Sequence, residues 1–314
     1  MPYTLSATGA LLRERAALLG RIRAFFAERG VLEVETPALS AAGISDPAIE
    51  SVTADLGGRR HWLHTSPEYA MKRLLAAGVG DCYQICRVFR EGELGRWHQP
   101  EFTMLEWYRV GWDETALMDE VEELIERAME DSILSRPGTR LSYARAFERR
   151  LGINPQGELS GLPDRLADFG IDVPDGLDRD ALLDLAFSEA VAARFEPGVL
   201  TFIHDYPASQ AALAAIKPQT PPLAARFEAF AGSIELANGF RELTDAAEQR
   251  ARFEKEIETR RARGQAVAPL DEAFLEALEQ GLPPCAGVAV GVDRLVALGA
   301  GLDNVADAMS FAHR

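Results

Sequence analysis

The 314-residue sequence lacks several features by which protein classes are recognised. Its three cysteines, Cys82, Cys86 and Cys285, are too few for a disulfide framework and favour a reducing, cytoplasmic compartment. The spacing of Cys82 and Cys86 invites a metal site, but no second pair and no His-x-x-His follows. We therefore interpret both as small core residues on one strand face. No apolar run is long enough to cross a bilayer and no basic-then-apolar leader begins at Met1, so we expect no membrane partner.

Basic charge is also scarce. The chain has 33 Lys+Arg against 49 Asp+Glu, a formal net charge of −16. A protein whose main partner is a phosphate backbone usually carries a basic face. The densest basic stretch, 250–263, alternates arginine with glutamate, which is typical of a solvated helix with i,i+4 pairs. Broad binding of tRNA or DNA is therefore not supported. A local basic patch that contacts one partner stays compatible with the sequence.

The two usual glycine-rich phosphate cradles, GxxxxGK[ST] and GxGxxG after a strand, are missing as well. If ATP binds, arginines and metal-bound carboxylates must hold its phosphates. What the sequence has instead is strands reached through long helices and hairpins. This order favours an α+β domain with a largely antiparallel sheet flanked by helices. Periodicity and caps predict helices at 10–29, 113–128, 142–150, 180–195 and 245–263, and strands at 31–37 and 199–207. The segment 285–299 reads as a strand that leads into a helix.

The interval 135–180 is rich in glycine, proline and aspartate. We interpret it as an insertion rather than a second core. The expected organisation is a single catalytic domain over 1–314, with a probable insertion at 135–197 and no separate N-terminal anticodon-binding domain.

The stretch Cys86–Arg109 carries the most functional information. It reads as two strands joined by a charged turn, and alternation places Arg90 on one face of the first strand. Phe102, Glu106 and Tyr108 share one face of the returning strand. These side chains on adjacent strands indicate a binding surface. The arginine suits an anionic group, the aromatic ring suits a flat group, and the carboxylate and phenol suit a cationic group. ATP plus an amino acid fits that description.

Three further segments supply polar groups: TSPE at 65–68 before a helix, RFEAFAGSIELANGFRELTD at 226–245 with a turn at Gly232, and GVAVGVDRL at 287–295. Together with the hairpin they resemble the signature motifs of class II aminoacyl-tRNA synthetases of the lysine subgroup. Motif 1 resembles the helix 10–29 with the strand ending at Pro37, motif 2 the Cys86–Arg109 stretch, and motif 3 the 287–295 segment. The resemblance covers nearly the whole chain.

Several blocks resemble a particular branch of that family. Lysyl-tRNA synthetases have an anticodon-binding barrel and typically a glycine where this chain has Ala289. PASQA at 207–211, ELANGF at 235–240 and EFTMLEWYR at 101–109 look like the truncated paralogues that act on elongation factor P. The resemblance implies a homodimeric, ATP- and Mg²⁺-dependent ligase. Such a ligase activates (R)-β-lysine, or lysine, as an adenylate and transfers it to a lysine side chain of that protein.

The resemblance also implies roles for individual residues. Arg90 and Arg294 are the expected catalytic residues. The ATP-binding set is Arg90, Glu93, His98, Gln99, Phe102, Glu235, Leu236, Gly291 and Arg294. The substrate-binding set is Ser66, Glu68, Glu106, Tyr108, Asn238, Glu242 and Ala289, and the Mg²⁺ ligands are Glu228 and Glu235. Desolvating the two ammonium groups of lysine is expensive unless carboxylates meet them, and three glutamates with a phenol supply that chemistry.

The chain departs from the family at two places in motif 2. Gly92 stands where a glutamate is usual, so we expect Glu93 to make its contact, and Gln99 replaces an asparagine. His98 could act as a base, but a turn histidine that orders the loop is the more ordinary interpretation.

Each residue also has a structural alternative. Arg90 could pair with Glu106 across the hairpin, the aromatic side chains could be core residues, Glu228 and Glu235 could be solvated, and Glu68 could be a helix-start carboxylate. For Trp107, on the opposite face, the core interpretation is preferred. Two other functions stay open: a truncated lysyl-tRNA synthetase that acts on tRNA, and a non-catalytic, synthetase-like regulatory subunit.

Overall fold

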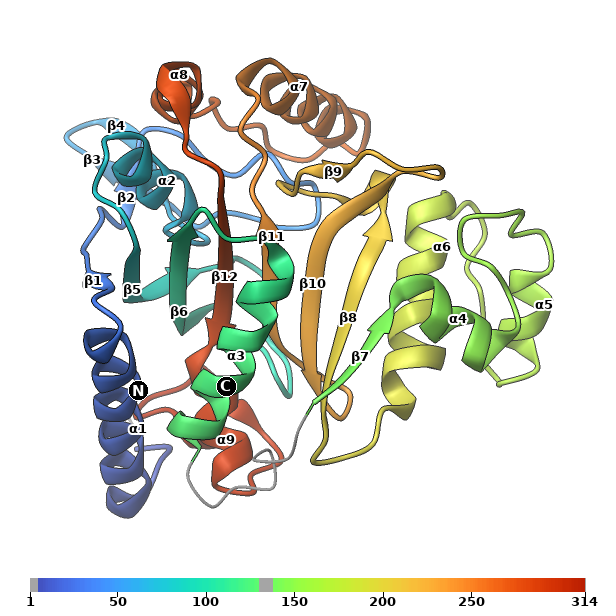
Figure 1. Ribbon diagram of the computed structural model, residues 1–314, viewed down its shortest axis with the longest axis horizontal. Coiled ribbons are helices and arrows are strands. Elements are labelled where there is room, and N and C mark those ends of the chain that lie inside the picture. Colours follow the sequence, from blue (N-terminus) through green and yellow to red (C-terminus); the bar gives the residue numbers. More distant parts are fainter. Residues whose placement is uncertain (1–4, 130–137, 314) are drawn as a thin grey trace. The chain divides into compact units, whose positions relative to one another are not determined.

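The computed structural model, drawn in Figure 1, describes residues 5–129 and 138–313. The chain divides into two compact units. The first unit draws on Met1–Gly111, Thr244–Cys285 and Ala289–Arg314, and the second on Trp112–Leu243 and Ala286–Val288. The expected single domain with an insertion at 135–197 stays a prediction, and its residues 135–137 lie outside the described residues. None of the described helices is long and apolar enough to cross a membrane.

The first unit begins with helix α1, Gly9–Glu28, which confirms the helix predicted at 10–29. Thr8 caps its N-terminus, and Gly30 follows its end with a left-handed φ of +67°. Strand β1, Leu32–Glu33, is shorter than the predicted strand 31–37. It pairs in parallel with β5, Cys82–Phe89, and one further hydrogen bond, from Val34 N to Tyr83 O, extends the contact.

Strands β5 and β6, Glu101–Val110, form the antiparallel hairpin that the sequence predicted. The register pairs Val88 with Phe102, so Phe102, Glu106 and Tyr108 share one face, as expected. Trp107 lies on the opposite face and is fully buried against α1, with its ring 5.4 Å from that of Phe26. The core interpretation of Trp107 is therefore confirmed.

The rest of the first unit surrounds this hairpin. The sequence predicted the helix after 65–68, the charged helix and the final strand–helix pair, but not the three short strands or α8. The elements are β2 Leu39–Ser40, β3 Thr53–Leu56, β4 Arg59–Leu63, α2 Glu68–Ala76, α7 Ala246–Ala262, α8 Glu272–Gly281, α9 Val292–Gly299 and a 3-10 turn at Val305–Ala308. Strand β12, Cys285–Gly291, is divided, because its residues Ala286–Val288 belong to the second unit.

The second unit contains a sheet in the order β11-β10-β8-β7, with β9 beside β10. β10 pairs antiparallel with β8, β9 and β11, whereas β7 and β8 are parallel. The predicted hairpin with its turn at Gly232 is confirmed, as is the strand ending at Pro207. The elements are α3 Glu114–Ala128, β7 Thr139–Ser142, α4 Tyr143–Leu151, α5 Leu162–Ala167, α6 Arg179–Ala186, a π turn Phe187–Val191, 3-10 turns at Ala192–Arg194 and Ala208–Gln210, β8 Leu200–Pro207, β9 Ile216–Lys217, β10 Leu223–Ala231 and β11 Ile234–Arg241.

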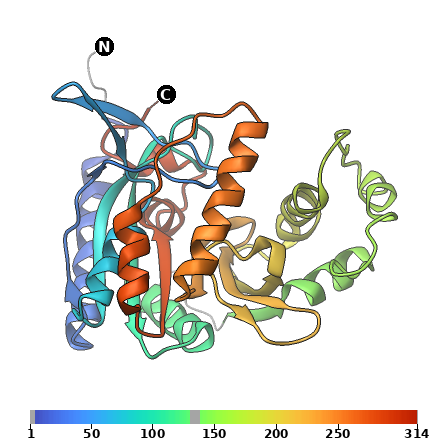
Figure 2. The same cartoon turned by 90° about the horizontal axis from the view of Figure 1, so that it is seen from above.

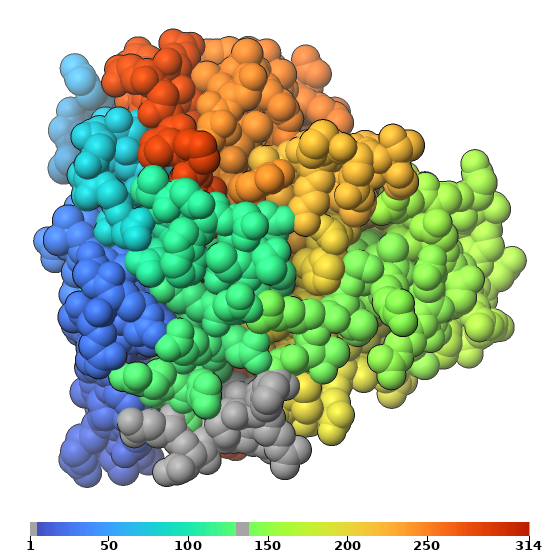
Figure 3. Space-filling model, viewed as in Figure 1, coloured from blue at the N-terminus to red at the C-terminus, as the bar shows by residue number. Residues whose placement is uncertain are grey.

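Helices α4, α5 and α6 group together in the second unit, and Figure 3 shows their residues as one continuous light-green mass (Figures 2 and 3). Tyr143, Phe147, Leu166 and Leu183 from these helices are buried with Tyr206 of β8 in one hydrophobic cluster. The same cluster includes Ile203 of β8 and Ala224 and Phe230 of β10, so these helices pack on the sheet of the second unit. The interpretation of 135–180 as an insertion rather than a second core stays a prediction.

Candidate active site

Arg90 follows β5 directly and lies at the end of the predicted binding face. Its Nε donates to the carbonyl oxygen of Thr65 at 3.4 Å, and its Nη1 lies 3.6 Å from Glu93 Oε1. Its guanidinium carbon is 5.2 Å from the centroid of the Phe102 ring. The alternative of an ion pair with Glu106 is wrong for the described structure, because Glu106 is held by other donors.

Glu106 is buried in the middle of β6, with 2% of its surface exposed. Ser66 Oγ donates to its Oε2 and Tyr108 OH donates to its Oε1, both at 2.6 Å. Burial, and then the nearby charge of Glu68, raise the pKa of Glu106 from 4.5 to about 7. A buried carboxyl group with such a pKa suits a cationic ligand, because a bound ammonium group would lower this pKa and favour the ionised form.

Glu68 begins α2 and lines a cavity of about 120 Å³ together with Ser66 and His64. Its backbone N–H donates to Ser66 Oγ at 3.0 Å. Its Oε1 accepts a hydrogen bond from Lys72 Nζ at 2.6 Å, and the Lys72 side chain is only 1% exposed. Sequence reasoning missed Lys72, although the i,i+4 spacing from Glu68 is the signal that could have found it.

Arg294 of α9 lies beside the motif 2 loop. Its Nε donates to the Trp97 carbonyl oxygen at 3.1 Å, and its Nη2 lies 2.9 Å from His98 Nε2. Burial, followed by the Arg294 charge, lowers the pKa of His98. The histidine therefore stays neutral at pH 7 and accepts from Arg294, which favours the loop-ordering interpretation over a catalytic base.

The neighbouring Asp293 is a second residue that the sequence did not single out. Its buried carboxylate accepts from Arg15 Nη1 of α1 at 2.5 Å and from the backbone N–H of Thr103 at 2.6 Å. Arg15 Nη2 also donates to Thr103 Oγ1 at 2.7 Å. The carboxylate thus joins the elements of motifs 1, 2 and 3 within the first unit and fixes the start of α9.

The structure shows the surroundings of Gln99 and Gly291, two residues that are predicted to contact ATP. Gln99 is buried, and both ends of its amide contact the backbone of His313, at 3.0 and 2.7 Å. Gly291 precedes α9, where the atoms nearest to an added Cβ would be those of the Arg294 side chain, at ordinary contact distances. The ATP contacts of both residues stay predictions, as does the pocket-shaping role of Ala289, which is half-buried on β12.

The second unit holds the predicted Mg²⁺ ligands on adjacent strands. Tyr206 OH donates to Glu228 Oε2 at 2.7 Å, and Arg226 donates to Oε1 of the same carboxylate. Burial raises the pKa of Glu228; Arg226 opposes this shift, and the charge of Glu235 adds to it. Sequence reasoning missed Arg226, although its place two residues before Glu228 puts it on the same strand face.

These carboxylates fit a magnesium ion. Mg²⁺ usually takes one or two carboxylates together with substrate phosphates. Glu228 and Glu235 supply two hard oxygen donors whose charges repel each other, so a divalent cation would relieve that repulsion. The remaining predicted residues of this unit lie on or beside β11. Leu236 and Glu242 are buried, and Asn238 Oδ1 lies 3.3 Å from Arg226 Nε.

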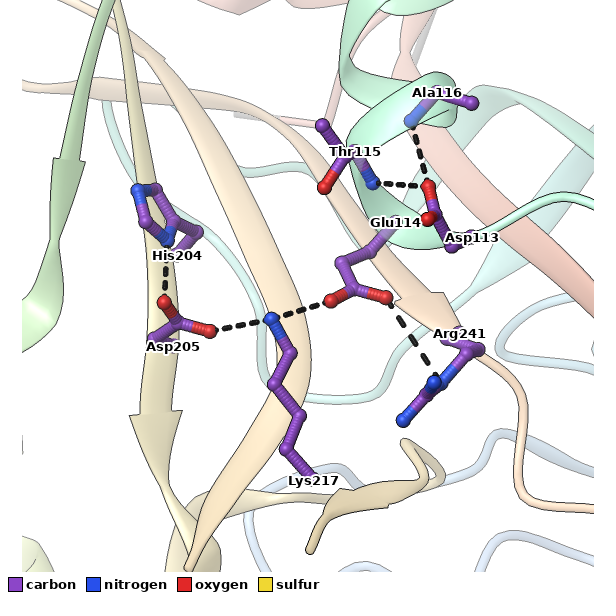
Figure 4. A network of polar contacts seen from close by, with 8 residues as sticks. All are labelled: Asp113, Glu114, Thr115, Ala116, His204, Asp205, Lys217 and Arg241. Carbon is purple, nitrogen blue, oxygen red and sulfur yellow. Dashed lines mark hydrogen bonds and ion pairs between the residues drawn. The ribbon is translucent and has the colours of Figure 1, made fainter. Parts of the chain in front are cut away.

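A separate polar network ties α3 to strands β8, β9 and β11 (Figure 4). Lys217 Nζ lies 2.5 Å from Glu114 Oε1 and 2.6 Å from Asp205 Oδ1, and His204 Nδ1 lies 2.8 Å from Asp205 Oδ2. Arg241 Nε is 3.9 Å from the other Glu114 oxygen. Burial opposes ionisation of Asp205, but the hydrogen bonds from His204 and Lys217 lower its pKa to about 2. The network therefore stabilises the second unit.

Comparison with known proteins identifies the family of this chain. The family of class II tRNA synthetases for D, K and N matches residues 4–314. This chain belongs to that family. The family resemblance and the α+β fold predicted from the motifs are therefore confirmed.

Individual relatives are also similar over nearly their whole length. An elongation factor P–(R)-β-lysine ligase of Salmonella arizonae is 46% identical over 309 residues, which is 96% of this chain and 94% of the relative. Proteins of the same name from Salmonella paratyphi B and Salmonella heidelberg match equally well.

Proposed function

We propose that this chain is an ATP-dependent ligase that activates (R)-β-lysine, or more weakly lysine, and transfers it to a lysine side chain of elongation factor P. The observation that carries the proposal is the 46% identity, over 96% of the chain, to relatives that bear this name. The buried, hydrogen-bonded Glu106 supports it, because an acidic pocket of this kind suits an ammonium-bearing substrate.

The first step joins the amino acid to ATP. A carboxylate oxygen of the substrate attacks the α-phosphorus, the bond from this phosphorus to the bridging oxygen breaks, and pyrophosphate leaves. Arg90 neutralises the charge that develops at the α-phosphate, and Phe102 stacks on adenine. Arg294 contacts the nucleotide from α9, and Glu106 with Tyr108 orients the substrate through an ammonium group. No general base is needed, because the nucleophile is already ionised.

Magnesium would be held by Glu228 and Glu235 in the second unit. The ion supplies charge neutralisation on the triphosphate. Arg226 and Tyr206 hold the Glu228 carboxylate in one orientation.

The second step transfers the acyl group. A deprotonated amine of elongation factor P attacks the carbonyl carbon of the adenylate, the bond from that carbon to the phosphate oxygen breaks, and AMP leaves. The amide nitrogen loses its extra proton to solvent.

We further propose a cytoplasmic homodimer without stable tRNA binding. Leu32, which is 52% exposed on β1, provides apolar surface beside α1, where motif 1 predicts the dimer contact. The net charge of −16 opposes a nucleic acid partner. Three free cysteines suit a reducing compartment.

ATP–pyrophosphate exchange tests the activation step. The purified protein is assayed with (R)-β-lysine, (S)-β-lysine and α-lysine, each with ATP and Mg²⁺. We expect exchange with a preference for (R)-β-lysine. Silence with all three would reject adenylate formation, and lysylation of purified tRNA at a useful rate would reject the protein partner.

A further inference from the structure

Lys72 is a buried cation beside the predicted substrate pocket. It lies one helical turn after Glu68 on α2, with 1% of its side chain exposed and its Nζ 2.6 Å from Glu68 Oε1. Its Nζ also lies 5.8 Å from the centroid of the Phe274 ring on α8. A buried ammonium group is tolerated where a carboxylate meets it. The Glu68 carboxylate is therefore already engaged by a cation of the protein itself.

Ser66, Glu68 and Glu106 form one serine–carboxylate cluster. The Ser66 hydroxyl joins the other two residues, since it donates to Glu106 Oε2 and accepts from the backbone N–H of Glu68. The cluster holds two carboxylates, and Lys72 contributes one positive charge to it. When both carboxylates are ionised, one negative charge is in excess. One ammonium group of a substrate cancels it, whereas a second would leave an uncompensated positive charge in a buried place.

We propose that Lys72 is a positioning and specificity residue, which holds Glu68 and limits the serine–carboxylate cluster to one ammonium group of the substrate. The inference rests on the proposed function and deepens it. The sequence suggested that the glutamates serve the two ammonium groups of a diamino acid, but Glu68 is shared with an internal lysine. Glu106 is then the carboxylate of this cluster that carries the substrate charge.

Arg73 and Asp271 line the same cavity as Glu68 and bring one charge of each sign, so they leave the charge balance unchanged. The remaining groups bring no positive charge. Tyr108 donates to Glu106 from the same strand. Cys82 and Cys86 face Glu106 from β5, and burial raises the pKa of both thiols to about 12, so they remain neutral. Burial raises the pKa of Glu256 of α7 to about 7, and the charge of Glu68 adds to this rise, so Glu256 brings no positive charge to the cluster.

Tyr69, next to Glu68 on α2, is also neutral, because burial and then the Glu68 charge raise its pKa. Lys72 acts in the opposite sense to the neighbouring anions, since its charge lowers the pKa of Glu106. Removal of the lysine charge should therefore make Glu106 harder to ionise.

The test measures the association constant of (R)-β-lysine by calorimetry across pH in the full chain. In the wild type, binding should weaken about tenfold per pH unit below pH 7, where Glu106 becomes protonated. We call this fall in the association constant at low pH the acid limb. In Lys72→Met the pH at which the acid limb begins should rise by about one unit, and binding at pH 7 should be about tenfold weaker. Lys255→Met, which removes an exposed lysine of α7, is the matched control and should leave the limb in place.

The double variant E68Q/K72M removes both charges of the pair. Glu68 raises the pKa of Glu106 more than Lys72 lowers it, so the limb should fall to the wild-type pH or below. This double variant carries the test if K72M does not fold, and a limb above the wild type would then overturn the proposal. A folded K72M variant whose acid limb lies at the same pH as in the wild type would also overturn the proposal. A lysine with a purely structural role would lower stability when replaced, but it would leave the pH dependence of binding unchanged. Failure of the proposed function is separate, since pyrophosphate exchange rather than binding reports it.

Discussion

Replacement of Glu106 by glutamine should weaken substrate binding and stabilise the protein at the same time. Glu106 is 2% exposed, and its pKa is raised from 4.5 to about 7 by burial and then by Glu68. The folded state therefore holds this proton more tightly than the unfolded state does. The resulting loss of stability is absent below pH 4.5, grows as pH rises, and is complete above pH 7.

The magnitude follows from the pKa change. One pKa unit corresponds to about 1.4 kcal/mol, so the ionised Glu106 lowers the free energy of unfolding by about 3 kcal/mol at pH 8 and by less than about 1 kcal/mol at pH 5. Glutamine keeps the shape and can exchange hydrogen bonds with Ser66 and Tyr108, whose hydroxyls donate or accept. We expect Glu106→Gln to gain about 2–3 kcal/mol at pH 8 and to bind (R)-β-lysine at least about 100-fold more weakly.

Urea unfolding at pH 5 and pH 8, combined with pyrophosphate exchange, tests both effects. Glu101→Gln, at the more exposed beginning of the same strand, is the matched control and should change stability little at either pH. A stability difference for Glu106→Gln that is equal at both pH values, or a loss of stability at pH 8, would refute the reasoning. Glu106 would then be a structural carboxylate rather than one kept for the substrate.

Three further predictions concern other parts of the chain. Arg90→Ala should reduce pyrophosphate exchange by at least about 10³-fold, whereas Trp107→Phe should lose about 1–2 kcal/mol of stability and keep exchange; comparable loss of exchange in both would contradict the assigned faces. Asp293→Asn should raise the KM for ATP about tenfold without changing the KM for the amino acid, because the carboxylate fixes the start of α9; an unchanged KM for ATP would reject this role. Lys217→Met should cost about 2 kcal/mol at pH 7 in thermal unfolding. Because the folded-state pKa of Asp205 is lowered to about 2, this loss should shrink as pH falls from 4 towards 2, and a pH-independent loss would contradict it.

The hairpin of motif 2 was predictable because its signals are local. Strand alternation gave the shared face of Phe102, Glu106 and Tyr108, and turn residues marked its end. The same holds for α1, whose apolar spacing and following Gly30 fix both its face and its end. The short strands β2, β3 and β4 carry charged and half-exposed residues such as those of Arg59–Leu63, so their periodicity is too weak to identify them.

Part of the candidate site depends on tertiary contacts that no local pattern reveals. Hydropathy places a lysine at the surface, yet Lys72 is buried because Glu68 lies one turn away. The contact of Arg294 with His98 joins residues 196 positions apart. The family motifs indicated that both regions serve the nucleotide, but not that burial and then the Arg294 charge lower the pKa of His98.

The most direct test of the proposed function is the mass of elongation factor P after incubation with this protein, ATP, Mg²⁺ and (R)-β-lysine. We predict an increase by one β-lysyl group on a single lysine side chain, which disappears when ATP is omitted or when Arg90 is replaced by alanine. Unmodified elongation factor P, in a reaction that shows pyrophosphate exchange with (R)-β-lysine, would contradict the assignment of the protein partner.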